Sequence, residues 1–548
     1  MPTKIEMAKF AKFCKDMGFI YQSSEIYGGI NGFWDYGPLG VELKRNIKEA
    51  WWQDMVRNPP PGPDGQEIRM VGLDCAIIMN PKVWVASGHV GGFSDPMVDC
   101  LKCKRRFRAD KVHFAGALIG DTPHAISAEA DNATDARPIL LEKIAKLEKK
   151  KHPLGRVLAM APTLEFYSAT AIPKFWPQPC PADDCDGTLT EPRAFNLMFE
   201  SHAGPIASDD NKVYLRPETA QGIFANYRNV LDSTRLKLPF GIAQIGKAFR
   251  NEINPRNFTF RSREFEQMEI EFFCHPAESM KWYEYWRDLR KKWYSTLGIK
   301  SENLKPREQG KEELAHYSIG TTDIEYMFPF SDEPQELEGV AHRGAFDLSA
   351  HAKHSGKDLA YFDEEGWNNL IQERLEPFKD DKKRREEEKK KLEQTEKARF
   401  SYVPHVIEPS AGADRFTLAV LCEAYEEEEL TDSKGNKEKR TVMRFHPRLA
   451  PIKAAIFPLV NKDGMPEKAS ALYRELKPHF NVFFDDKGAV GRRYRRQDEA
   501  GTPFCITIDG QTLQDDTVTI RDRDTLKQER VPLSQVRSVI EKALTPGI

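Results

Sequence analysis

The segments Ala248-Phe249-Arg250-Asn251-Glu252 and, after a short loop, Phe260-Arg261-Ser262-Arg263-Glu264-Phe265-Glu266-Gln267-Met268-Glu269 decide the fold of this chain. Residues 242–273 predict a strand, a loop and a second strand. Successive side chains of a strand point to opposite faces, so Arg250 and Glu252 are expected on one face of the first strand. The hairpin therefore presents charged groups beside its loop.

The second strand of this hairpin has two faces of different character. One face carries an aromatic residue followed by polar groups, namely Phe265, Gln267, Glu269 and Glu271. The other face suits a core apart from its first member and consists of Glu266, Met268, Ile270 and Phe272. We expect the first face to line a cavity, because an arginine, an aromatic ring and carboxylates converge on adjoining strands. The alternative is a surface sheet face with paired charges.

A second arginine closes the segment Glu408-Pro409-Ser410-Ala411-Gly412-Ala413-Asp414-Arg415, which leads into an apolar run at 416–421. Guanidinium groups held at the ends of strands or helices suit a bent triphosphate, because their planar fork donates several N–H groups to phosphate oxygens. Arg250 and Arg415 together therefore predict a triphosphate site.

Length and composition limit the class of protein. A chain of 548 residues is too long for one hydrophobic core and predicts about three folded units. Its formal net charge of −3 argues against a polybasic binder and is compatible with a local basic stripe for nucleic acid. The sequence contains no apolar run that could cross a bilayer, and its first residues lack a signal-peptide core.

Several segments predict their own local structure. Leu43, Ile47, Ala50 and Trp51 recur at helical spacing, so a helix should begin after Pro38, for core packing or a dimer interface. Residues 195–273 are expected to form strands and turns. Charged helices are expected within 140–151 and 379–397, and an acidic loop or hairpin tip within 426–440. Residues 448–548 alternate strands with helices and predict a separate α/β domain.

Nine cysteines with uneven spacing indicate reduced thiols rather than a disulfide framework. Two pairs bracket residues 96–195 and form one candidate zinc site, made of Cys100, Cys103, Cys180 and Cys185. The alternative is four ordinary thiols, which the longer spacing of the second pair favours.

The two arginine segments resemble sequence motifs of a known family. The hairpin at 249–265 resembles motif 2 of class II aminoacyl-tRNA synthetases, Gly412–Arg415 resembles motif 3, and the helix at Pro38 resembles motif 1. Three strings narrow the resemblance to glycyl-tRNA synthetases of the homodimeric type: Trp34–Gly40, Arg216–Gly222 and Phe265–Glu269. The likeness extends over nearly the whole chain.

The resemblance implies an α/β (α+β) fold, with an antiparallel-sheet class II catalytic domain, insertions and a C-terminal α/β anticodon-binding domain. It divides the chain as follows: 1–95, the N-terminal part of the catalytic domain with motif 1; 96–195, an insertion with the zinc candidate; 196–345, the catalytic core with motif 2; 346–405, a second insertion with a charged helix; 406–447, the catalytic core with motif 3; and 448–548, the anticodon-binding domain.

The resemblance also implies a reaction. Glycine and ATP would form glycyl-adenylate and pyrophosphate, and the glycyl group would pass to the 3′-terminal adenosine of tRNA(Gly). Arg250, Glu252 and Arg415 would be catalytic, and Mg²⁺ would bind through an acid such as Glu336 or Glu408. The implied ATP-binding residues are Arg250, Asn251, Glu252, Phe260, Arg261, Ser262, Arg263, Glu264, Phe265, Glu336, Leu337, Gly412, Ala413, Asp414 and Arg415.

Glycine has no side chain, so its site is expected to bind the ammonium and carboxylate groups and to leave no room for a methyl group. Nothing smaller than glycine competes, so no editing domain is expected. The implied glycine-binding residues are Arg108, Glu218, Phe265, Glu266, Gln267, Met268, Glu269, Arg343, Glu408, Pro409, Ser410, Ala411 and Gly412.

The implied partners are tRNA(Gly), glycine, ATP and a second copy of the chain, in the cytoplasm and without a membrane. The basic stretch Lys487–Arg496, which contains Tyr494, suits contact with RNA. Two alternatives stay open: a non-catalytic synthetase-like tRNA-binding protein, and a synthetase for serine, threonine or proline. The intact arginines argue against the first, and the acid-rich pocket argues against the second.

Overall fold

The computed structural model describes residues 5–119, 122–130, 133–151, 167–168, 178–310, 314–315, 318–431 and 437–545. The chain forms two compact units. The first unit comprises Met1–Ser87, Glu218–Ala248 and Arg256–Ile548, and the second comprises Gly88–Pro217 and Phe249–Pro255. The predicted six-part division remains a prediction. None of the described helices is long and apolar enough to cross a membrane.

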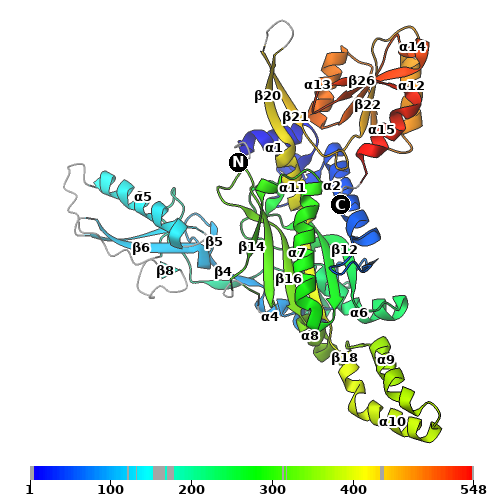
Figure 1. Cartoon of the computed structure of the whole chain (residues 1–548). Coiled ribbons are helices and arrows are strands. Elements are labelled where there is room, and N and C mark those ends of the chain that lie inside the picture. The colour runs from blue at the N-terminus through cyan, green and yellow to red at the C-terminus, as the bar shows by residue number, and fades with distance from the viewer. Residues whose placement is uncertain are drawn as a thin grey trace. The chain divides into compact units, whose positions relative to one another are not determined.

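A seven-stranded sheet forms the centre of the first unit (Figure 1). Its order is β14 (Leu304–Glu308), β15 (Gly320–Tyr326), β16 (Gln335–Gly344), β19 (His405–Gly412), β13 (Glu264–Cys274), β12 (Phe240–Phe249) and β3 (Arg69–Gly72). The pairs from β14 across to β13 are antiparallel, whereas β12 and β3 are parallel. The expected antiparallel-rich sheet is confirmed.

Three helices make the main core on one face of this sheet: α2 (Pro38–Trp52), α7 (Ser279–Thr296) and α11 (Ala413–Ala424). α7 and α11 pack on the sheet, and α2 packs on α11. The predicted helix at Pro38 is confirmed, since α2 begins at this residue. Proline suits the first helical position, where its missing N–H costs no bond. Met268, Ile270 and Phe272 face this core as expected.

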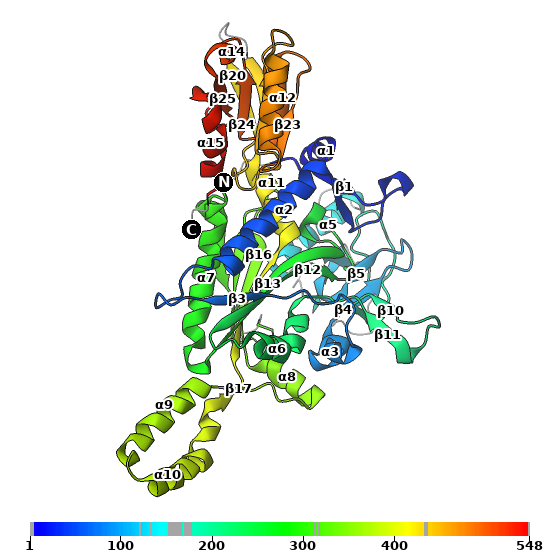
Figure 2. The same cartoon turned by 90° about the vertical axis from the view of Figure 1, so that its right-hand side faces the viewer.

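The opposite face carries α6 (Ala220–Thr234) and α8 (Phe346–Ser355), with α3 (Pro81–Ala86) beside both (Figure 2). α6 contradicts the expectation that residues 195–273 contain only strands and turns. Its buried residues Ile223, Phe224, Tyr227 and Val230 recur at helical spacing and pack against Phe240 and Phe273 of the strands.

A second correction concerns the predicted first strand. β12 ends at Phe249, so Arg250 and Glu252 follow the strand and do not share one of its faces. The backbone N–H of Glu252 donates to the carbonyl of Arg250 at 2.6 Å, which marks a tight turn at this point. Both charged side chains are therefore placed by the connection rather than by strand alternation.

The first unit also contains smaller elements around the large sheet. They are α1 (Met7–Asp16), β1 (Ile20–Gln22), β2 (Trp34–Tyr36), β17 (Tyr361–Phe362), α9 (Glu364–Leu375), α10 (Lys382–Thr395), β18 (Ser401–Tyr402), β20 (Tyr425–Thr431) and β21 (Lys437–Met443). α10 confirms the charged helix predicted within 379–397. β20 and β21 form an antiparallel hairpin. This agrees with the hairpin alternative that was predicted, beside a loop, for residues 426–440.

The C-terminal part of the first unit has its own five-stranded sheet, in the order β23-β22-β24-β25-β26. Its elements are β22 (Ala454–Pro458), α12 (Met465–Leu476), β23 (Val482–Phe484), α13 (Val490–Ala500), β24 (Phe504–Ile508), α14 (Thr512–Asp515), β25 (Thr517–Asp522), β26 (Gln528–Pro532) and α15 (Val536–Ala543). The predicted alternating α/β unit is confirmed. The sequence missed β26, because its exposed polar residues carry no apolar alternation.

The second unit is built from short sheets. β5-β4-β9 and β7-β6-β8 have three strands each, and β10 pairs with β11. The elements are α4 (His89–Gly92), β4 (Ser94–Asp99), β5 (Arg106–Arg108), β6 (Val112–Ile119), β7 (Thr122–Glu129), α5 (Ala133–Lys151), β8 (Tyr167–Ser168), β9 (Arg193–Asn196), β10 (Glu200–His202) and β11 (Lys212–Tyr214). α5 includes the charged helix predicted within 140–151.

Candidate functional site

Three glutamates lie together on the α6 face of the large sheet. Glu269 and Glu271 are two residues apart on β13, so they share a face, and Glu408 comes from the neighbouring strand β19. The register pairs Glu269 with Ser410 and Phe272 with Ile407, which places Glu271 opposite Glu408. Carboxylate oxygens of the three lie within 4.8 Å of one another. We call them the acid cluster.

One arginine borders the acid cluster. Arg343, near the end of β16, donates through Nε and Nη2 to the two carboxylate oxygens of Asp347 at 2.7 and 2.8 Å, and through Nη1 to Glu408. The Arg343 side chain is buried, so this fork fixes both acids in place. The predicted neighbourhood of Arg343 and Glu408 is therefore present.

The chain that leads into α6 supplies further polar contacts. The Thr219 hydroxyl donates to Oε2 of Glu269 at 2.7 Å, and the Thr219 backbone N–H donates to Oε1 of Gln267 at 3.2 Å. Gln267 in turn donates to the Ser410 hydroxyl at 3.3 Å. Gln221 donates to Glu218 at 3.0 Å. The first three bonds join Thr219, which directly precedes α6, to β13 and β19 in one network.

Sequence reasoning missed three members of this network: Thr219, Gln221 and Asp347. Thr219 and Gln221 belong to the quoted string Arg216–Gly222, yet nothing in that string says which side chains point inward. Gln221 donates to Asp347 at 3.1 Å and pairs with His351 at 2.9 Å. These contacts cross about 130 positions of sequence and need the folded chain to appear.

Burial shifts the acids toward their protonated forms. It is the main cause that raises the pKa of Glu269, and it raises the pKa of Glu271 and of Glu408 well above the ordinary range. The negative neighbours add to this effect, while Arg343 opposes it for Glu271 and Glu408. A bound cation would stabilise the charged forms of these carboxylates.

Some predicted glycine-site residues lie elsewhere. Glu266 points to the α2 side, where Lys44 and Lys48 each approach its carboxylate at 2.8 Å. Asp414, predicted for ATP, also bonds Lys44 on that side, at 2.7 Å. Three predicted residues are buried in the main core, namely Met268, Leu337 and Ala411. Their side chains contribute to packing there.

Arg415, at the start of α11, is held beside an aromatic group. Its Nε donates to the carbonyl of Phe260 at 3.2 Å, and its carbon Cζ lies 4.8 Å from the centre of the Phe260 ring. Its Nη1 lies 3.2 Å from both the backbone carbonyl and the carboxylate of Glu336. The Arg415 side chain is 29% exposed, so the guanidinium keeps access to solvent and to a ligand.

The other predicted ATP residues of the first unit lie just before β13, at its start, and where β19 passes into α11. Arg263 donates from its backbone N–H to the carbonyl of Gly32 at 2.7 Å and from its side chain to the carbonyl of Asn31 at 2.8 Å. Glu264 pairs with Lys247. The others range from buried to half-buried: Arg261, Ser262, Phe265, Gly412 and Ala413.

Four predicted residues belong to the second unit. Arg250 donates through Nε to the carbonyl of Pro217 at 3.1 Å and lies 5.6 Å from the ring centre of Phe93. Asn251 donates its N–H to the carbonyl of Leu197 at 2.7 Å. Arg108 donates to both oxygens of Asp110, at 3.1 and 2.8 Å. The fourth is Glu252.

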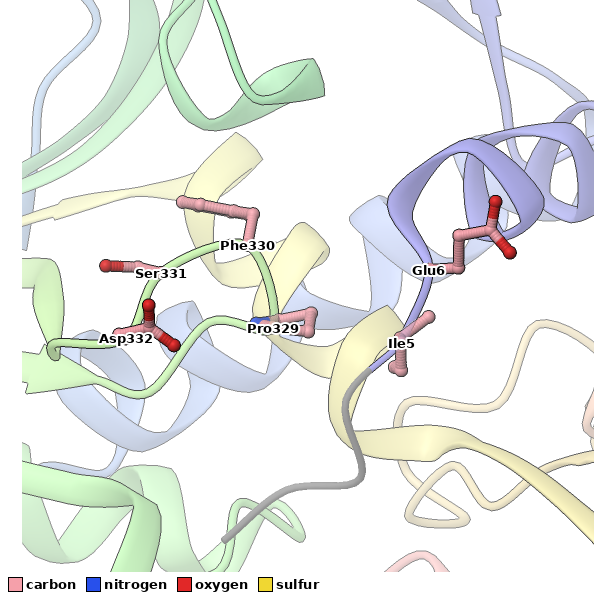
Figure 3. Close-up of a pocket in the computed structure, with 6 residues that line it drawn as sticks. All are labelled: Ile5, Glu6, Pro329, Phe330, Ser331 and Asp332. Atoms are coloured by element: carbon pink, nitrogen blue, oxygen red, sulfur yellow. The ribbon is translucent and has the colours of Figure 1, made fainter. Parts of the chain in front are cut away.

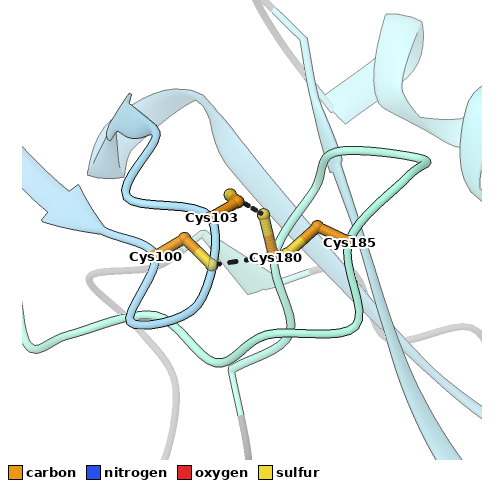
Figure 4. A group of neighbouring side chains, drawn as sticks. All are labelled: Cys100, Cys103, Cys180 and Cys185. Atoms are coloured by element: carbon orange, nitrogen blue, oxygen red, sulfur yellow. Dashed lines mark hydrogen bonds between the residues drawn. The ribbon is translucent and has the colours of Figure 1, made fainter.

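The four predicted zinc ligands come together in the second unit (Figure 4). The sulfurs of Cys100 and Cys185 are 3.6 Å apart, and those of Cys103 and Cys180 are 3.8 Å apart. Tetrahedral zinc with bonds of about 2.3 Å sets neighbouring sulfurs about 3.8 Å apart, so the group fits the metal. A Cβ on Gly187 would lie 2.6 Å from the Cys100 sulfur, which explains a glycine at this position.

An open pocket lies between the start of the described chain and the loop after Phe328 (Figure 3). Its volume is about 430 Å³, and the segment at Ile5 and Glu6 faces the loop Pro329–Asp332 across it. None of its six lining residues is a predicted site residue. The candidate site is therefore the buried acid cluster and its surroundings.

Comparison with known proteins places this geometry in a family. The chain is 53% identical to a glycine–tRNA ligase of Rhodopirellula baltica, over 98% of this chain and 99% of that protein. The chain belongs to the glycine–tRNA ligase family. It is also 47% identical to the glycine–tRNA ligase of Clostridium perfringens, over 99% of this chain and 100% of that protein.

Two family profiles match parts of this ligase. The tRNA synthetase class II core domain (G, H, P, S and T) matches residues 201–425, and the anticodon binding domain matches residues 453–543. A solved prolyl-tRNA synthetase of Cryptosporidium parvum has a TM-score of 0.55 at 12% identity, covering 99% of this chain and 76% of that chain. That likeness concerns the fold. The predicted class II fold and anticodon-binding domain are confirmed.

The family fixes the reaction. The enzyme is an ATP-dependent glycine–tRNA ligase, so its substrates are glycine, ATP and tRNA, and class II synthetases in general use Mg²⁺. The two alternative functions, a non-catalytic tRNA-binding protein and a synthetase for serine, threonine or proline, are thereby set aside.

Proposed function

We propose that the acid cluster and its surroundings form the glycine-binding site of this ligase. The observation that carries the proposal is the group of carboxylates beside one buried arginine. Glu218, Glu269 and Glu408 would bind the ammonium group, because buried carboxylates need a cation. Arg343 would offset the repulsion among the acids. Ser410, which the family resemblance adds, would complete the contacts to glycine.

Rejection of alanine would come from the rigidity of this site. Gln267 is tied to Thr219 and to Ser410, and Glu269 is tied to Thr219. A methyl group on the substrate would have to displace a hydrogen-bonded side chain, and the buried partner left behind would lose its bond. We therefore expect strong discrimination without an editing site.

The two arginines would act on ATP. A carboxylate oxygen of glycine attacks the α-phosphorus, a P–O bond forms, and the bond from the α-phosphorus to the bridging oxygen of pyrophosphate breaks. Arg250 would stabilise the charge that builds on the α-phosphate, and Arg415 would hold the γ-phosphate. Phe265 would stack on adenine. This part of the proposal rests on the motif likeness and on each arginine's own surroundings.

Of the two acids predicted for Mg²⁺, Glu336 is the better candidate. Its side chain is 52% exposed, whereas Glu408 bonds the buried Arg343. Bound Mg²⁺ supplies neutralisation of phosphate charge. The Glu336 carboxylate also lies 3.2 Å from the Arg415 guanidinium. The proposed Mg²⁺ ligand and the proposed γ-phosphate ligand are therefore neighbours.

Pyrophosphate exchange with glycine, alanine and serine tests these assignments. We expect exchange with glycine only. Arg250→Ala and Glu269→Gln should each abolish glycine-dependent exchange, with a rate loss of at least about 100-fold, while thermal unfolding stays cooperative. Near-normal exchange by Glu269→Gln would remove the acid cluster from the glycine site.

We also propose that Cys100, Cys103, Cys180 and Cys185 bind one structural zinc ion. Metal analysis of protein purified without chelators should find about one zinc per chain. Cys100→Ser should lose the metal and lower the melting temperature. A metal-free wild-type protein with an unchanged melting temperature would contradict the proposal.

The proposed partner of the anticodon-binding domain is the anticodon end of tRNA(Gly). Arg493 in the basic stretch is buried and donates to the carbonyl of Pro458 at 2.7 Å, so its role is structural. Arg492 and Arg496 are exposed and are the better candidates for phosphate contacts. Arg492→Ala should raise the KM for tRNA and leave pyrophosphate exchange unchanged.

The proposed oligomer is a homodimer formed through α2. Hollows of about 390 and 610 Å³ run beside this helix, and Arg45 and Lys48 line both. Light scattering should give twice the 62.7 kDa of one chain. A cytoplasmic location is proposed because none of the nine cysteines, all of which the structure describes, forms a disulfide.

A further inference from the structure

An ionic network lies on the α2 side of the large sheet. Oδ1 of Asp414 accepts a hydrogen bond from the Tyr36 hydroxyl at 2.6 Å and another from Nζ of Lys44 at 2.7 Å. Oδ2 of Asp414 accepts the backbone N–H of Glu266 at 2.6 Å. The carboxylate of Glu266 is contacted by the ammonium groups of Lys44 and Lys48, each at 2.8 Å. The network therefore joins β2 and α2 to the first turns of β13 and α11.

Both acids of this network stand next to residues that are proposed to contact ATP. Asp414 directly precedes Arg415 in the first turn of α11, and Glu266 directly follows Phe265 on β13. Alternation along the strand turns Phe265 to the face opposite Glu266. α11 packs against both α2 and β13 (Figure 2). A backbone shift at either acid would therefore move a side chain proposed for the nucleotide.

Apolar contacts already dock α2 on the first unit. Leu43, Ile47 and Trp51 of this helix are buried in the main core. A buried ion pair adds little net stability, because the loss of hydration offsets the attraction between the charges. It does require one geometry of its partners, since charge-assisted hydrogen bonds are short and directional. The network is therefore better suited to fixing positions than to holding the helix.

The charges of the network depend on Lys44. The side chains of Lys44, Glu266 and Asp414 are only 12%, 15% and 8% exposed. Burial alone would raise the pKa of Glu266, but Lys44 and Lys48 outweigh it and hold this pKa below its ordinary value. Without the Lys44 ammonium, the carboxylates of Glu266 and Asp414 would repel each other in poorly solvated surroundings. The backbone segments that carry them would then separate.

We infer that Lys44 and Tyr36 are positioning residues for ATP: they hold Asp414 and Glu266, and so fix the backbone from which Arg415 and Phe265 reach the nucleotide. This inference rests on the proposed roles of Arg415 and Phe265. Lys44 and Tyr36 would act through their acid partners and would not touch ATP. Their bonds to Asp414 span 370 and 378 positions, so no local pattern in the sequence predicts them.

The test compares the KM values for ATP and for glycine in pyrophosphate exchange by the full-length enzyme. Lys44→Met keeps most of the side-chain volume and removes the charge. It should raise the KM for ATP by about 10-fold, because two contacts to the nucleotide lose their alignment, and change the KM for glycine less than about twofold. Tyr36→Phe removes one bond to Asp414 and should raise the KM for ATP by about threefold. An unchanged KM for ATP in both variants, or an equal rise of both KM values, would overturn the inference.

Two controls separate positioning from other effects. Arg448 pairs with the buried Asp54, just after α2, at 2.9 Å, and neither residue adjoins a proposed ATP contact. Arg448→Met should lower the melting temperature and leave the KM for ATP unchanged; a rise like that of Lys44→Met would show that any lost ion pair near α2 has this effect. Lys44 also lines the hollow of about 390 Å³ beside α2. Light scattering should therefore give Lys44→Met the same mass as the wild type, and a smaller mass would assign its effect to subunit contact instead.

Arg415→Ala distinguishes failure of this inference from failure of the proposed ATP site. If Arg415→Ala impairs exchange while Lys44→Met and Tyr36→Phe keep the wild-type KM for ATP, the inference fails and the proposed site stands. If Arg415→Ala also keeps the wild-type KM for ATP, the proposed role of Arg415 is wrong, and the inference falls with it.

Discussion

Glu338 on β16 and Glu271 on β13 are both buried carboxylates of the same sheet, separated by the single strand β19. Glu338 accepts two bonds from the guanidinium of Arg290, at 2.7 and 3.0 Å, and one from the Tyr294 hydroxyl at 2.5 Å. Glu271 accepts none from the described residues. The same residue type, at the same burial, is satisfied by the chain in one place and unsatisfied in the other.

The difference teaches how to separate structural acids from binding acids. A satisfied buried acid stabilises the fold only as long as its partners remain. An unsatisfied one is a cost that selection tolerates where a ligand supplies the missing charge. Burial alone does not distinguish the two, whereas the hydrogen-bond partners do.

The largest expected effect on stability comes from removing the hydrogen-bond partner of Glu338. Arg290→Met leaves Glu338 buried beside Tyr294 without its cation, and we expect it to lower the free energy of unfolding by about 3–5 kcal/mol. Chemical denaturation checks this value. The folded fraction should keep the wild-type KM for glycine; a raised KM would place Arg290 in the binding network and weaken the comparison.

A fall in pH should protonate the buried His342 and remove the hydrogen bond that its ring nitrogen accepts. His342 is buried, and its Nδ1 accepts the N–H of Gly344 at 3.2 Å. Burial, followed by the nearby His405, lowers the pKa of His342 to about 4 from its ordinary 6.5. The unfolded chain then binds the proton more tightly, so the contribution of His342 to stability is complete above pH 6.5 and is lost as the pH falls toward 4.

This loss amounts to about 3 kcal/mol at pH 4. His342→Asn keeps a hydrogen-bond acceptor and removes the titrating ring, so its free energy of unfolding should depend less on pH across that window. Denaturation series at pH 7, 6, 5 and 4 for both proteins give the measurement. Parallel curves for the two proteins would show that His342 does not titrate in this range.

A smaller effect is expected where the acid cluster meets its arginine. Arg343→Lys keeps the charge but cannot make the two-pronged contact with Asp347 and the bond to Glu408 together. We expect the KM for glycine to rise by about 10-fold, equivalent to about 1.4 kcal/mol, with the KM for ATP little changed. An equal rise in both KM values would indicate a general distortion of the site.

The smallest effect should come from an exposed pair. Arg228 and Asp232 on α6 are 3.0 Å apart, and their side chains are 50% and 58% exposed. Arg228→Ala should change the free energy of unfolding by less than about 0.5 kcal/mol, because solvent screens the pair. A loss above about 1 kcal/mol would mean that burial of the partners is a poor guide to their energetic weight in this protein.

Much of the fold was accessible from local patterns. The alternation in 265–272 correctly separated the core residues Met268, Ile270 and Phe272 from the polar face, and the helical spacing after Pro38 correctly predicted α2. α6 does not follow from the strand pattern expected over 195–273, because its helical spacing is confined to a short stretch between two strands. The strand end at Phe249 was also missed, since the turn at Arg250 has no glycine or proline to mark it.

The candidate site was accessible only in part. The family resemblance predicts Glu269, Glu408 and Arg343 as parts of one site, and the fold places all three side by side. Glu266 was included with them because it stands in the same string, yet it faces Lys44 and Lys48 on the other side of the sheet. Asp347 and Thr219 are missing from the predicted site because their contacts come from distant parts of the chain. Thr219 bonds Gln267 and Glu269 about 50 positions away, and Asp347 bonds Gln221 126 positions away.

The sequence by itself determined the reaction class, the helix after Pro38 and the two faces of β13, because motifs, periodicity and alternation are local properties of the chain. Only the tertiary structure decided which buried acids are satisfied. Glu338 meets Arg290 across 48 positions, while Glu408 meets Arg343 across 65. The energy of a buried charge depends on the partners that folding brings to it, and those partners lie beyond the reach of any local pattern.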